Sequence, residues 1–336
     1  MTGRPDLRHA FAQANGLDPA QEVMIAGDAS FRSYYRYPYQ SGTAIVMDAP
    51  PEDGEDCRPF IFVARWLKAQ GWSAPDIIAE DVGQGFLILE DLGDDLFKPL
   101  IETTKAPVEL LYGTAVDLLV CAAQVPAPAE IPAYDEAVLA REVELLTDYY
   151  WPLAHGENLP AAARDSFFAA WQKLWPLVAK PDNPVLVMRD YHAENLIWLP
   201  ARSGVARVGL LDFQDALAGH AAYDLISLAD DARRDVSQAE RRFMFDRYVA
   251  GRLAVSPDFN RAEFDTAAEI LAAQRNTKII GIFARLAVRD GKPLYLDLLG
   301  RVWGYLTSNL EHAAMTELKA WFDEYCPHDT RKNIKQ

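Results

Sequence analysis

The motif Met188-Arg189-Asp190-Tyr191-His192-Ala193-Glu194-Asn195, followed by the apolar run 196–199, is the most informative part of this 336-residue chain. A further acidic residue, Asp212, follows a second apolar run at 208–211. We expect residues 184–188 to form a short buried strand that leads into the motif. Residues 196–199 and 205–211 have the pattern of a hairpin, which would return Asp212 beside Asn195.

The order of these polar residues is typical of kinases, which place an Asp, an Asn five positions later and another Asp after the next strand. In such sites the first Asp accepts the proton of the attacking hydroxyl, and the Asn and second Asp hold Mg²⁺ against the nucleotide phosphates. The pattern therefore predicts Asp190 as the general base and Asn195 and Asp212 as metal ligands. The alternative is that Asp190 and Asn195 cap a loop and Asp212 begins a turn.

The motif resembles the catalytic loop of the aminoglycoside phosphotransferase and choline kinase superfamily. The resemblance spans most of the chain, from residue 26 to residue 305, and is carried also by residues 211–216, 223–225, 274–276 and 281–285. Within the superfamily, these motifs are most similar to those of bacterial anomeric sugar kinases that act on N-acetylmuramate and N-acetylglucosamine in cell-wall recycling. The resemblance implies ATP and Mg²⁺ as cofactors and a hydroxyl of a small amino sugar as acceptor. Aminoglycoside kinases and other small-alcohol kinases, of the choline or homoserine type, are the alternative enzymes.

Hydrophobic patterning before the motif predicts a small antiparallel sheet. Strands are expected at 23–26, 33–39, 43–48, 76–80 and 86–89, and helices at 4–15 and 55–70. Later segments are mainly helical, at 107–125, 134–150, 161–179 and from 223 onward. We therefore expect an α+β, two-lobed, protein-kinase-like fold. Residues 1–91 would form an N-lobe that covers the nucleotide, and residues 92–336 a C-lobe with the catalytic loop, metal and sugar sites.

Two segments of the expected N-lobe are candidates for nucleotide binding. Residues 27–31 resemble the turn that covers phosphates, with backbone N–H groups of Asp28, Ala29, Ser30 and Phe31, although this composition is also common in turns. Residues 90–95 would be the lobe hinge, where backbone groups near Glu90 and Leu92 meet adenine. The alternative for the hinge is an ordinary acidic loop.

The strand expected at 43–48 has no lysine, although protein kinases place one on this strand. Arg32 or Arg36 could present a guanidinium fork to phosphate instead, or either could be a strand arginine that faces solvent. The missing lysine permits a function of another class, a nucleotide-binding pseudokinase. The retention of Asp190, Asn195 and Asp212 argues against that class.

The residues that could contact the acceptor substrate are basic. On a helix, Arg275 would share an arc of about 60° with three further cations, Lys278, Arg285 and Arg289. Our hypothesis is that Arg275, or the pair Arg233-Arg234, binds a lactyl carboxylate or the product phosphate. The alternative is a charged helix face paired with acidic neighbours.

Three further polar residues in or near the motifs have two possible roles each. Asp215 could contact metal or substrate, or form an Asx-turn. Asp224 is expected to cap the next helix or to support the catalytic loop. His192 is expected to pack within the loop rather than to transfer a proton.

Composition narrows the class of protein. Lys plus Arg number 33 against 49 for Asp plus Glu, so the net charge of −16 disfavours nucleic acid and anionic membranes as partners, although it would suit a cationic aminoglycoside. Three scattered cysteines lack metal-site spacing and fit reduced thiols in a cytoplasm. Charged residues near the N-terminus argue against a signal peptide, and no apolar run of about eighteen residues predicts a spanning helix. We expect a cytoplasmic monomer with a small-molecule substrate.

Overall fold

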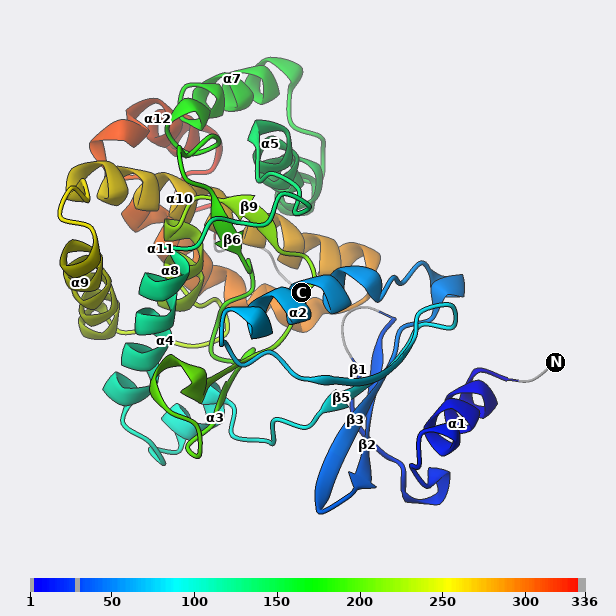
Figure 1. Cartoon of the computed structure of the whole chain (residues 1–336). Coiled ribbons are helices and arrows are strands. Elements are labelled where there is room, and N and C mark those ends of the chain that lie inside the picture. Colours follow the sequence, from blue (N-terminus) through cyan, green and yellow to red (C-terminus); the bar gives the residue numbers. More distant parts are fainter. Residues whose placement is uncertain (1–2, 28–30, 332–336) are drawn as a thin grey trace. The chain divides into compact units, whose positions relative to one another are not determined.

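The computed structural model describes residues 3–27 and 31–331, which belong to two compact units (Figure 1). The first unit comprises Met1–Lys105 and Glu194–Asp215, and the second comprises Ala106–Ala193 and Ala216–Gln336. The expected lobe boundary at residues 91 and 92 therefore differs from the division into compact units, and it stays a prediction about function. Residues 194–215 group with the first unit because bridges join Ser73 to Gly209 and Leu96 to Ile197.

The first unit is built around an antiparallel five-stranded sheet with the order β1-β2-β3-β5-β4. Its strands are β1 (Val23–Gly27), β2 (Ser33–Tyr39), β3 (Gly42–Asp48), β4 (Ile77–Asp81) and β5 (Phe86–Glu90). The central strands β3 and β5 are almost continuously apolar and buried, whereas β4 alternates in exposure at the edge. All five strands lie where the hydrophobic pattern predicts them, within one or two residues at each end.

Helices α1 (Arg4–Ala14), α2 (Arg58–Ala69) and α3 (Phe97–Glu102) complete this unit, with 3₁₀ turns η1 (Pro19–Gln21) and η2 (Pro51–Asp53). Helix α1 contributes Ala12 to a core cluster with Tyr37 of β2 and Val46 of β3. Helix α2 stacks Phe60 on Phe213, with ring centroids 4.9 Å apart. The residues that follow β8 are therefore packed against α2.

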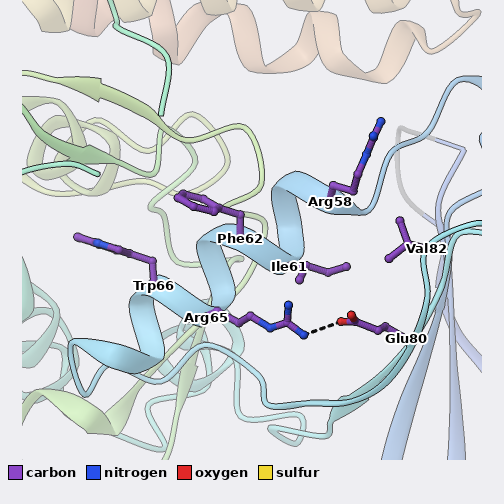
Figure 2. Close-up of a pocket in the computed structure, with 7 residues that line it drawn as sticks. All are labelled: Arg58, Ile61, Phe62, Arg65, Trp66, Glu80 and Val82. Atoms are coloured by element: carbon purple, nitrogen blue, oxygen red, sulfur yellow. Dashed lines mark hydrogen bonds and ion pairs between the residues drawn. The ribbon is translucent and has the colours of Figure 1, made fainter. Parts of the chain in front are cut away.

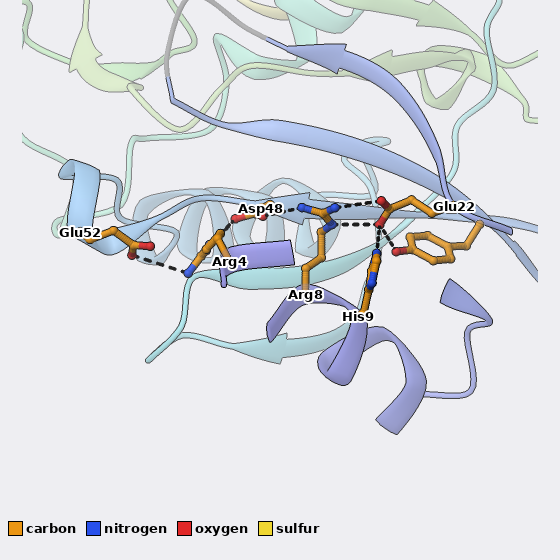
Figure 3. A network of polar contacts seen from close by, with 7 residues as sticks. Arg4, Arg8, His9, Glu22, Asp48 and Glu52 are labelled. Carbon is orange, nitrogen blue, oxygen red and sulfur yellow. Dashed lines mark hydrogen bonds and ion pairs between the residues drawn. The ribbon is translucent and has the colours of Figure 1, made fainter. Parts of the chain in front are cut away.

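An ionic network fastens α1 to the sheet (Figure 3). The guanidinium of Arg8 donates to both carboxylate oxygens of Glu22, at 2.9 and 2.8 Å, and to Asp48 at the end of β3, at 3.2 Å. Arg4 donates to the same Asp48 at 2.8 Å, and the hydroxyl of Tyr37 donates to Glu22. Because Arg8 and Asp48 are buried, each of these charges depends on the others for compensation.

The hairpin after the motif consists of β7 (Leu196–Trp198) and β8 (Val208–Leu210), paired from Leu196↔Leu210 to Trp198↔Val208. The prediction of a strand over 205–211 was too long, because Gly204–Arg207 forms the 3₁₀ turn η5. Gly204 begins that turn with φ +56°, a conformation that glycine adopts without strain.

The second unit is helical apart from one two-stranded sheet of β6 (Val185–Val187) and β9 (Leu217–Gly219). The sequence predicted β6 and missed β9. The helices are α4 (Val108–Ala122), α5 (Glu136–Leu145), α6 (Trp151–His155), α7 (Ala161–Gln172), α8 (Ala222–Ala229), α9 (Gln238–Val255), α10 (Arg261–Arg289), α11 (Leu299–Asn309) and α12 (Thr316–Tyr325). Short turns are the π-turn η3 (Leu146–Tyr150) and the 3₁₀ turns η4 (Trp175–Leu177), η6 (Pro293–Leu298) and η7 (Ala313–Met315).

Helix α10 is the centre of this unit, and α5, α8 and α11 pack against it (Figure 1). Gly281 permits the closest approach, because a Cβ there would lie 2.3 Å from the backbone of Leu145. The helix expected over 134–150 begins at Glu136 as α5, and it continues without a break through the π-helical η3 into α6. By contrast, the helix expected over 161–179 ends at Gln172. Within residues 3–27 and 31–331, no helix is both long and apolar enough to span a membrane.

Candidate active site

A pocket of about 470 Å³ opens in the first unit, within the range of small-molecule sites. Five of the predicted site residues line it: Arg36, Glu90, Leu92, Asn195 and Asp212. Its walls come from β2, β3 and β5, from the segment after β5 and from the β7–β8 hairpin. The sheet and the residues that flank the β7–β8 hairpin therefore line one cavity. Binding of a nucleotide there stays a prediction.

The hairpin brings Asn195 and Asp212 together. Asn195 immediately precedes β7 and Asp212 follows β8 after one residue, and the N–H of Leu211 donates to the carbonyl of Asn195 at 3.0 Å. The side-chain nitrogen of Asn195 then lies 3.4 Å from a carboxylate oxygen of Asp212. Asp212 has φ +56°, a conformation that costs roughly 1 kcal/mol for a non-glycine residue. Such strain at a polar residue is typical of functional sites.

The donor atoms around Asp212 suit a hard divalent cation. Gln214 donates to one carboxylate oxygen of Asp212 at 2.8 Å, and the amide oxygen of Gln214 is buried and has no hydrogen-bond partner among residues 3–27 and 31–331. The Asn195 amide can present its oxygen to the same space after a half-turn of its side chain. Carboxylate and amide oxygens are ligands that Mg²⁺ accepts. This mixed carboxylate and amide set is the candidate metal site.

Arg36 does not reach toward Asn195 and Asp212 but binds the segment after β5. Its guanidinium donates to Asp91 at 2.6 and 3.1 Å and to Asp94 at 3.0 and 2.8 Å. Burial would raise the pKa of Asp91, but hydrogen bonds from Arg36 and Thr43 lower it overall. These contacts favour a role for Arg36 in holding the pocket rim, and its phosphate contact stays a prediction.

The expected hinge residues lie on the pocket wall. The Glu90 carboxylate accepts from Arg202 at 2.5 Å and from the N–H of Asp76 at 3.2 Å. The N–H of Glu90 donates to the carbonyl of Asp76 at 2.8 Å. Two residues after Glu90, the side chain of Leu92 packs against Gly209 of β8. A Cβ atom added at Gly209 would lie only 3.2 Å from a methyl carbon of Leu92. The hinge segment is thus anchored to both the sheet and the hairpin.

The expected phosphate-covering turn is described in part. Asp28, Ala29 and Ser30 lie outside the described residues. Phe31 is 67% exposed and its N–H donates to Glu55 at 3.2 Å, and Arg32 forms an ion pair with the same Glu55 at 3.4 Å. Their contacts with a nucleotide stay predictions.

Asp190 belongs to the second unit, in the loop that follows β6, and this loop is held at several points. The buried carboxylate of Asp224 accepts the N–H of Met188 at 2.7 Å and the N–H of Arg189 at 2.9 Å. Ser227 donates to the carbonyl of Arg189 at 2.9 Å, and Arg189 has φ +71°. Asp224 therefore supports the catalytic loop, which is one of the two roles that the sequence allowed.

Electrostatics differ between the acidic groups of this loop region. Burial raises the pKa of Asp224 to about 7, against the effect of its two N–H donors. Burial also acts to raise the pKa of Asp190, but nearby positive charges, that of Lys278 first, lower it overall. Burial and the charge of Arg233 lower the pKa of His192 to about 4. His192 is therefore neutral at pH 7, and its Nε2 lies 3.1 Å from Arg233.

The other predicted acceptor contacts are engaged within the second unit. Arg275 is 3% exposed and donates to the carbonyl of Asp230 at 3.3 Å and to Ser227 at 2.9 Å. Arg234 donates to Glu240 at 2.5 Å and to the hydroxyl of Tyr112 at 3.0 Å. These contacts favour the paired, structural alternative for both arginines.

Arg233 and Asp215 are the other two residues predicted to contact the acceptor. Arg233 lies beside His192 of the catalytic loop, and Asp215 is exposed at the end of the first unit's second segment. Binding of the acceptor by either residue stays a prediction.

Three polar residues of these sites were not predicted as functional. Gln214 contacts Asp212, and its position within the motif 211–216 was the available signal. Glu142 and Lys278 form an ion pair of 2.9 Å near the catalytic loop, and nothing in the sequence links α5 with α10.

A second hollow, of about 590 Å³, lies on the outer side of α2 (Figure 2). Phe62 and Trp66 of α2 line it, and an ion pair of 2.7 Å joins Arg65 to Glu80 across it. None of the predicted site residues is among its lining residues in the described chain. The candidate active site is therefore the pocket that five of the predicted residues line.

Comparison with known proteins identifies the family of this chain. Residues 23–264 match the model of the phosphotransferase enzyme family (APH). The N-acetylmuramate/N-acetylglucosamine kinase of Caulobacter vibrioides is 39% identical, over 98% of this chain and 98% of its own length. The protein of the same name from Pseudomonas aeruginosa is 38% identical, over 86% of this chain and 84% of its own.

Solved structures support the fold. A choline/ethanolamine kinase family protein from Mesorhizobium loti has a TM-score of 0.62 at 13% identity, over 94% of this chain and 97% of its own. The ADP-bound aminoglycoside phosphotransferase APH(2'')-Ib has a TM-score of 0.60 at 13% identity, over 90% and 96%. These similarities confirm the predicted kinase-like α+β fold. From the family match and the extent of the sequence identity, the chain belongs to the phosphotransferase enzyme family and is a kinase.

Proposed function

We propose that this kinase transfers the γ-phosphate of ATP, with Mg²⁺, to the anomeric hydroxyl of N-acetylmuramate or N-acetylglucosamine. The observation that most supports this acceptor is the 39% identity, over 98% of both chains, to a kinase named for these two sugars. The reaction would belong to the recycling of cell-wall sugars in the cytoplasm, by a monomer. The three cysteines, all free thiols in the structure, are consistent with a reducing compartment.

In this proposal the first unit binds the nucleotide. Backbone groups near Glu90 and Leu92 would meet adenine, and Asn195 and Asp212 would hold the metal. The metal, when bound, neutralises charge on the phosphates as the phosphoryl group is transferred. Functionally, residues 1–91 would cover the nucleotide, and the chain from residue 92 onward would carry the catalytic and sugar sites.

Asp190 would be the general base. It would accept the proton of the sugar hydroxyl, while the hydroxyl oxygen forms a bond to the γ-phosphorus and the bond from that phosphorus to the β–γ bridging oxygen breaks. The low pKa of its carboxylate supports this role, because the base must be ionised before the hydroxyl reacts. Five positions of sequence separate Asp190 from Asn195, so one loop would link the base to the metal site.

An ADP-release assay over N-acetylmuramate, N-acetylglucosamine, kanamycin and choline tests the proposal. We expect turnover with the two amino sugars, and an acid-labile sugar phosphate as product, since phosphates on the anomeric carbon hydrolyse readily in acid. Asp190→Asn should lower kcat by about 10²–10⁴-fold while nucleotide binding persists. Turnover with kanamycin or choline alone would reassign the acceptor. Nucleotide binding without turnover of any acceptor would indicate a pseudokinase.

A further inference from the structure

The residue that precedes the proposed base has an unusual backbone conformation. Arg189 has φ +71°, in the left-handed region that residues with a side chain seldom adopt. In the tight turn that follows, the N–H of Asp190 donates to the carbonyl of Met188 at 2.9 Å. Because φ and ψ of Arg189 set the path of the chain into Asp190, relaxation of Arg189 would reorient the carboxylate of the base.

The backbone of Arg189 is held by helix α8. The carboxylate of Asp224 accepts the N–H of Arg189 at 2.9 Å, and the hydroxyl of Ser227 donates to its carbonyl at 2.9 Å. Both residues of α8 are buried, so water does not readily replace either contact. A strained conformation persists only where the surrounding contacts overdetermine it, and these two contacts are one part of that support.

The side chain of Arg189 is held from another helix. Its guanidinium donates to Glu142 of α5 at 2.5 Å, and it lies over the ring of Tyr134, with 5.9 Å to the ring centroid. Glycine would adopt the same φ without strain, but it would offer no group for α5 to bind. The arginine is therefore an anchored residue, and its side-chain contact compensates for the cost of its backbone conformation.

Glu142 is itself fixed in position. It is 7% exposed, and one of its oxygens accepts from the hydroxyl of Tyr134 at 2.5 Å and from Gln274 of α10 at 2.9 Å. Lys278 of α10 binds the oxygen that also binds Arg189, at 2.9 Å. Burial would raise the pKa of Glu142, but the charges of Lys278 and Arg189 lower it to about 2, so the carboxylate is ionised at pH 7. The anchor is thus a buried, charged acceptor that contacts on α10 hold in place.

We infer that Glu142 is a positioning residue for the base. It holds Arg189 in the left-handed conformation, and that conformation aims the carboxylate of Asp190. The inference rests on the proposed function in that Asp190 serves as the base. It extends the machinery of the reaction to α5, through a residue 47 positions before Arg189 in the chain.

Amide hydrogen exchange in the full-length protein tests the inference without turnover. The N–H of Met188 donates to a buried carboxylate at 2.7 Å, so its exchange rate reports how firmly the turn is held. We expect this rate to rise about tenfold in Glu142→Gln and in Arg189→Ala, because the left-handed conformation then loses its anchor. Glu144→Gln is the matched control, since Glu144 lies on the same helix and pairs with Arg164, outside the loop. Equal exchange of the Met188 N–H in Glu142→Gln and the wild type would overturn the inference.

Glycine at position 189 separates the backbone conformation from the side chain. We expect kcat to fall by about tenfold in Arg189→Ala, and Arg189→Gly to recover most of that loss, because glycine adopts the left-handed conformation without an anchor. KM for ATP and for the sugar should stay near the wild-type values, since the base moves and the binding contacts do not. Equal losses of kcat in the two variants would contradict the inference. This comparison also decides the matter if Glu142→Gln does not fold.

The combination of Glu142→Gln with Arg189→Gly tests the route of the effect. If Glu142 acts through Arg189, the glutamine substitution should lower kcat in the wild-type background and leave it nearly unchanged in the Arg189→Gly background. An equal loss in both backgrounds would show that Glu142 acts by another route, against the inference. If the wild-type protein phosphorylates no amino sugar, the proposed function fails, and hydrogen exchange still decides whether Glu142 holds the loop.

Discussion

Replacement of Asp224 by alanine should disable the catalytic loop and destabilise the second unit. The carboxylate accepts two backbone N–H groups, from Met188 at 2.7 Å and from Arg189 at 2.9 Å. Without it, two N–H groups in a buried region lose their acceptor, and the left-handed conformation of Arg189, φ +71°, loses its support.

The loss of unfolding free energy in Asp224→Ala can be estimated from those two hydrogen bonds, and it depends on pH. A buried N–H left without a partner costs about 1–3 kcal/mol, so the two together predict a loss of roughly 2–6 kcal/mol. Burial raises the pKa of Asp224 from 3.8 to about 7, so the native state binds a proton more tightly than the unfolded chain does. The contribution of Asp224 to the free energy of unfolding is therefore fully present below about pH 4. It declines by up to about 4 kcal/mol as the pH rises toward and beyond 7. The cost of Asp224→Ala should consequently be larger at pH 5 than at pH 8.

Urea unfolding at pH 5 and pH 8, with ADP release under the same conditions, measures both effects. We expect kcat to fall by about 10²-fold, because a displacement of about 1 Å in a catalytic group costs that much. Ser227→Ala is the matched control, since Ser227 donates to the carbonyl of the same Arg189 but carries no charge. Because Ser227 also accepts a hydrogen bond from the buried Arg275, its loss should cost about 2–4 kcal/mol, and this cost should be independent of pH. The reasoning would be refuted if the loss of unfolding free energy in Asp224→Ala were larger at pH 8 than at pH 5, or if the variant kept a normal kcat.

Two further substitutions test the first unit. Gln214→Leu removes the hydrogen bond that orients Asp212, so the Mg²⁺ concentration for half-maximal nucleotide binding should rise by about 10–100-fold. Calorimetric titration with Mg²⁺ measures this concentration. An unchanged value would exclude a supporting role for Gln214. Arg8→Met leaves the buried Asp48 with one cationic partner fewer, so the free energy of unfolding should fall by roughly 3 kcal/mol in urea titration. Arg58→Met is its control, because the exposed side chain of Arg58 pairs with Asp56 at the surface, where water screens the two charges. Equal losses in the two variants would contradict the importance of burial.

Local patterns were sufficient to predict the sheet and the proximity of Asn195 and Asp212. Strands β1 to β5 are long enough for apolar and aromatic residues to show their periodicity, and the hairpin of β7 and β8 follows from two apolar runs separated by a turn. Because strand pairing places flanking residues side by side, the meeting of Asn195 and Asp212 could be inferred from spacing.

Pairings between distant segments could not be predicted in this way. Strand β9 has three residues and pairs with β6 only in the folded unit, so its sequence carries no periodic signal. The direction of Arg36 depends on its register opposite Ile45 and on the position of Asp91. The contact of Lys278 with Glu142 requires α5 and α10 to be packed together, which no local rule specifies.

The charge of the nucleotide pocket explains why a kinase of this family can function without a lysine on β3. In the described lining of the pocket, four side chains carry carboxylates, and Arg36 alone carries a positive charge. Arg36 is already bound by Asp91 and Asp94, so it cannot neutralise a triphosphate without giving up contacts that hold the rim. An acidic pocket repels a polyanion unless the countercharge arrives with the ligand. Asn195 and Asp212 are suited to that arrangement, because in the proposed function their side-chain oxygens would bind the divalent cation that a nucleotide carries. The absence of the lysine is therefore compatible with catalysis, and it places more of the charge compensation on the metal and on the residues that orient Asp212.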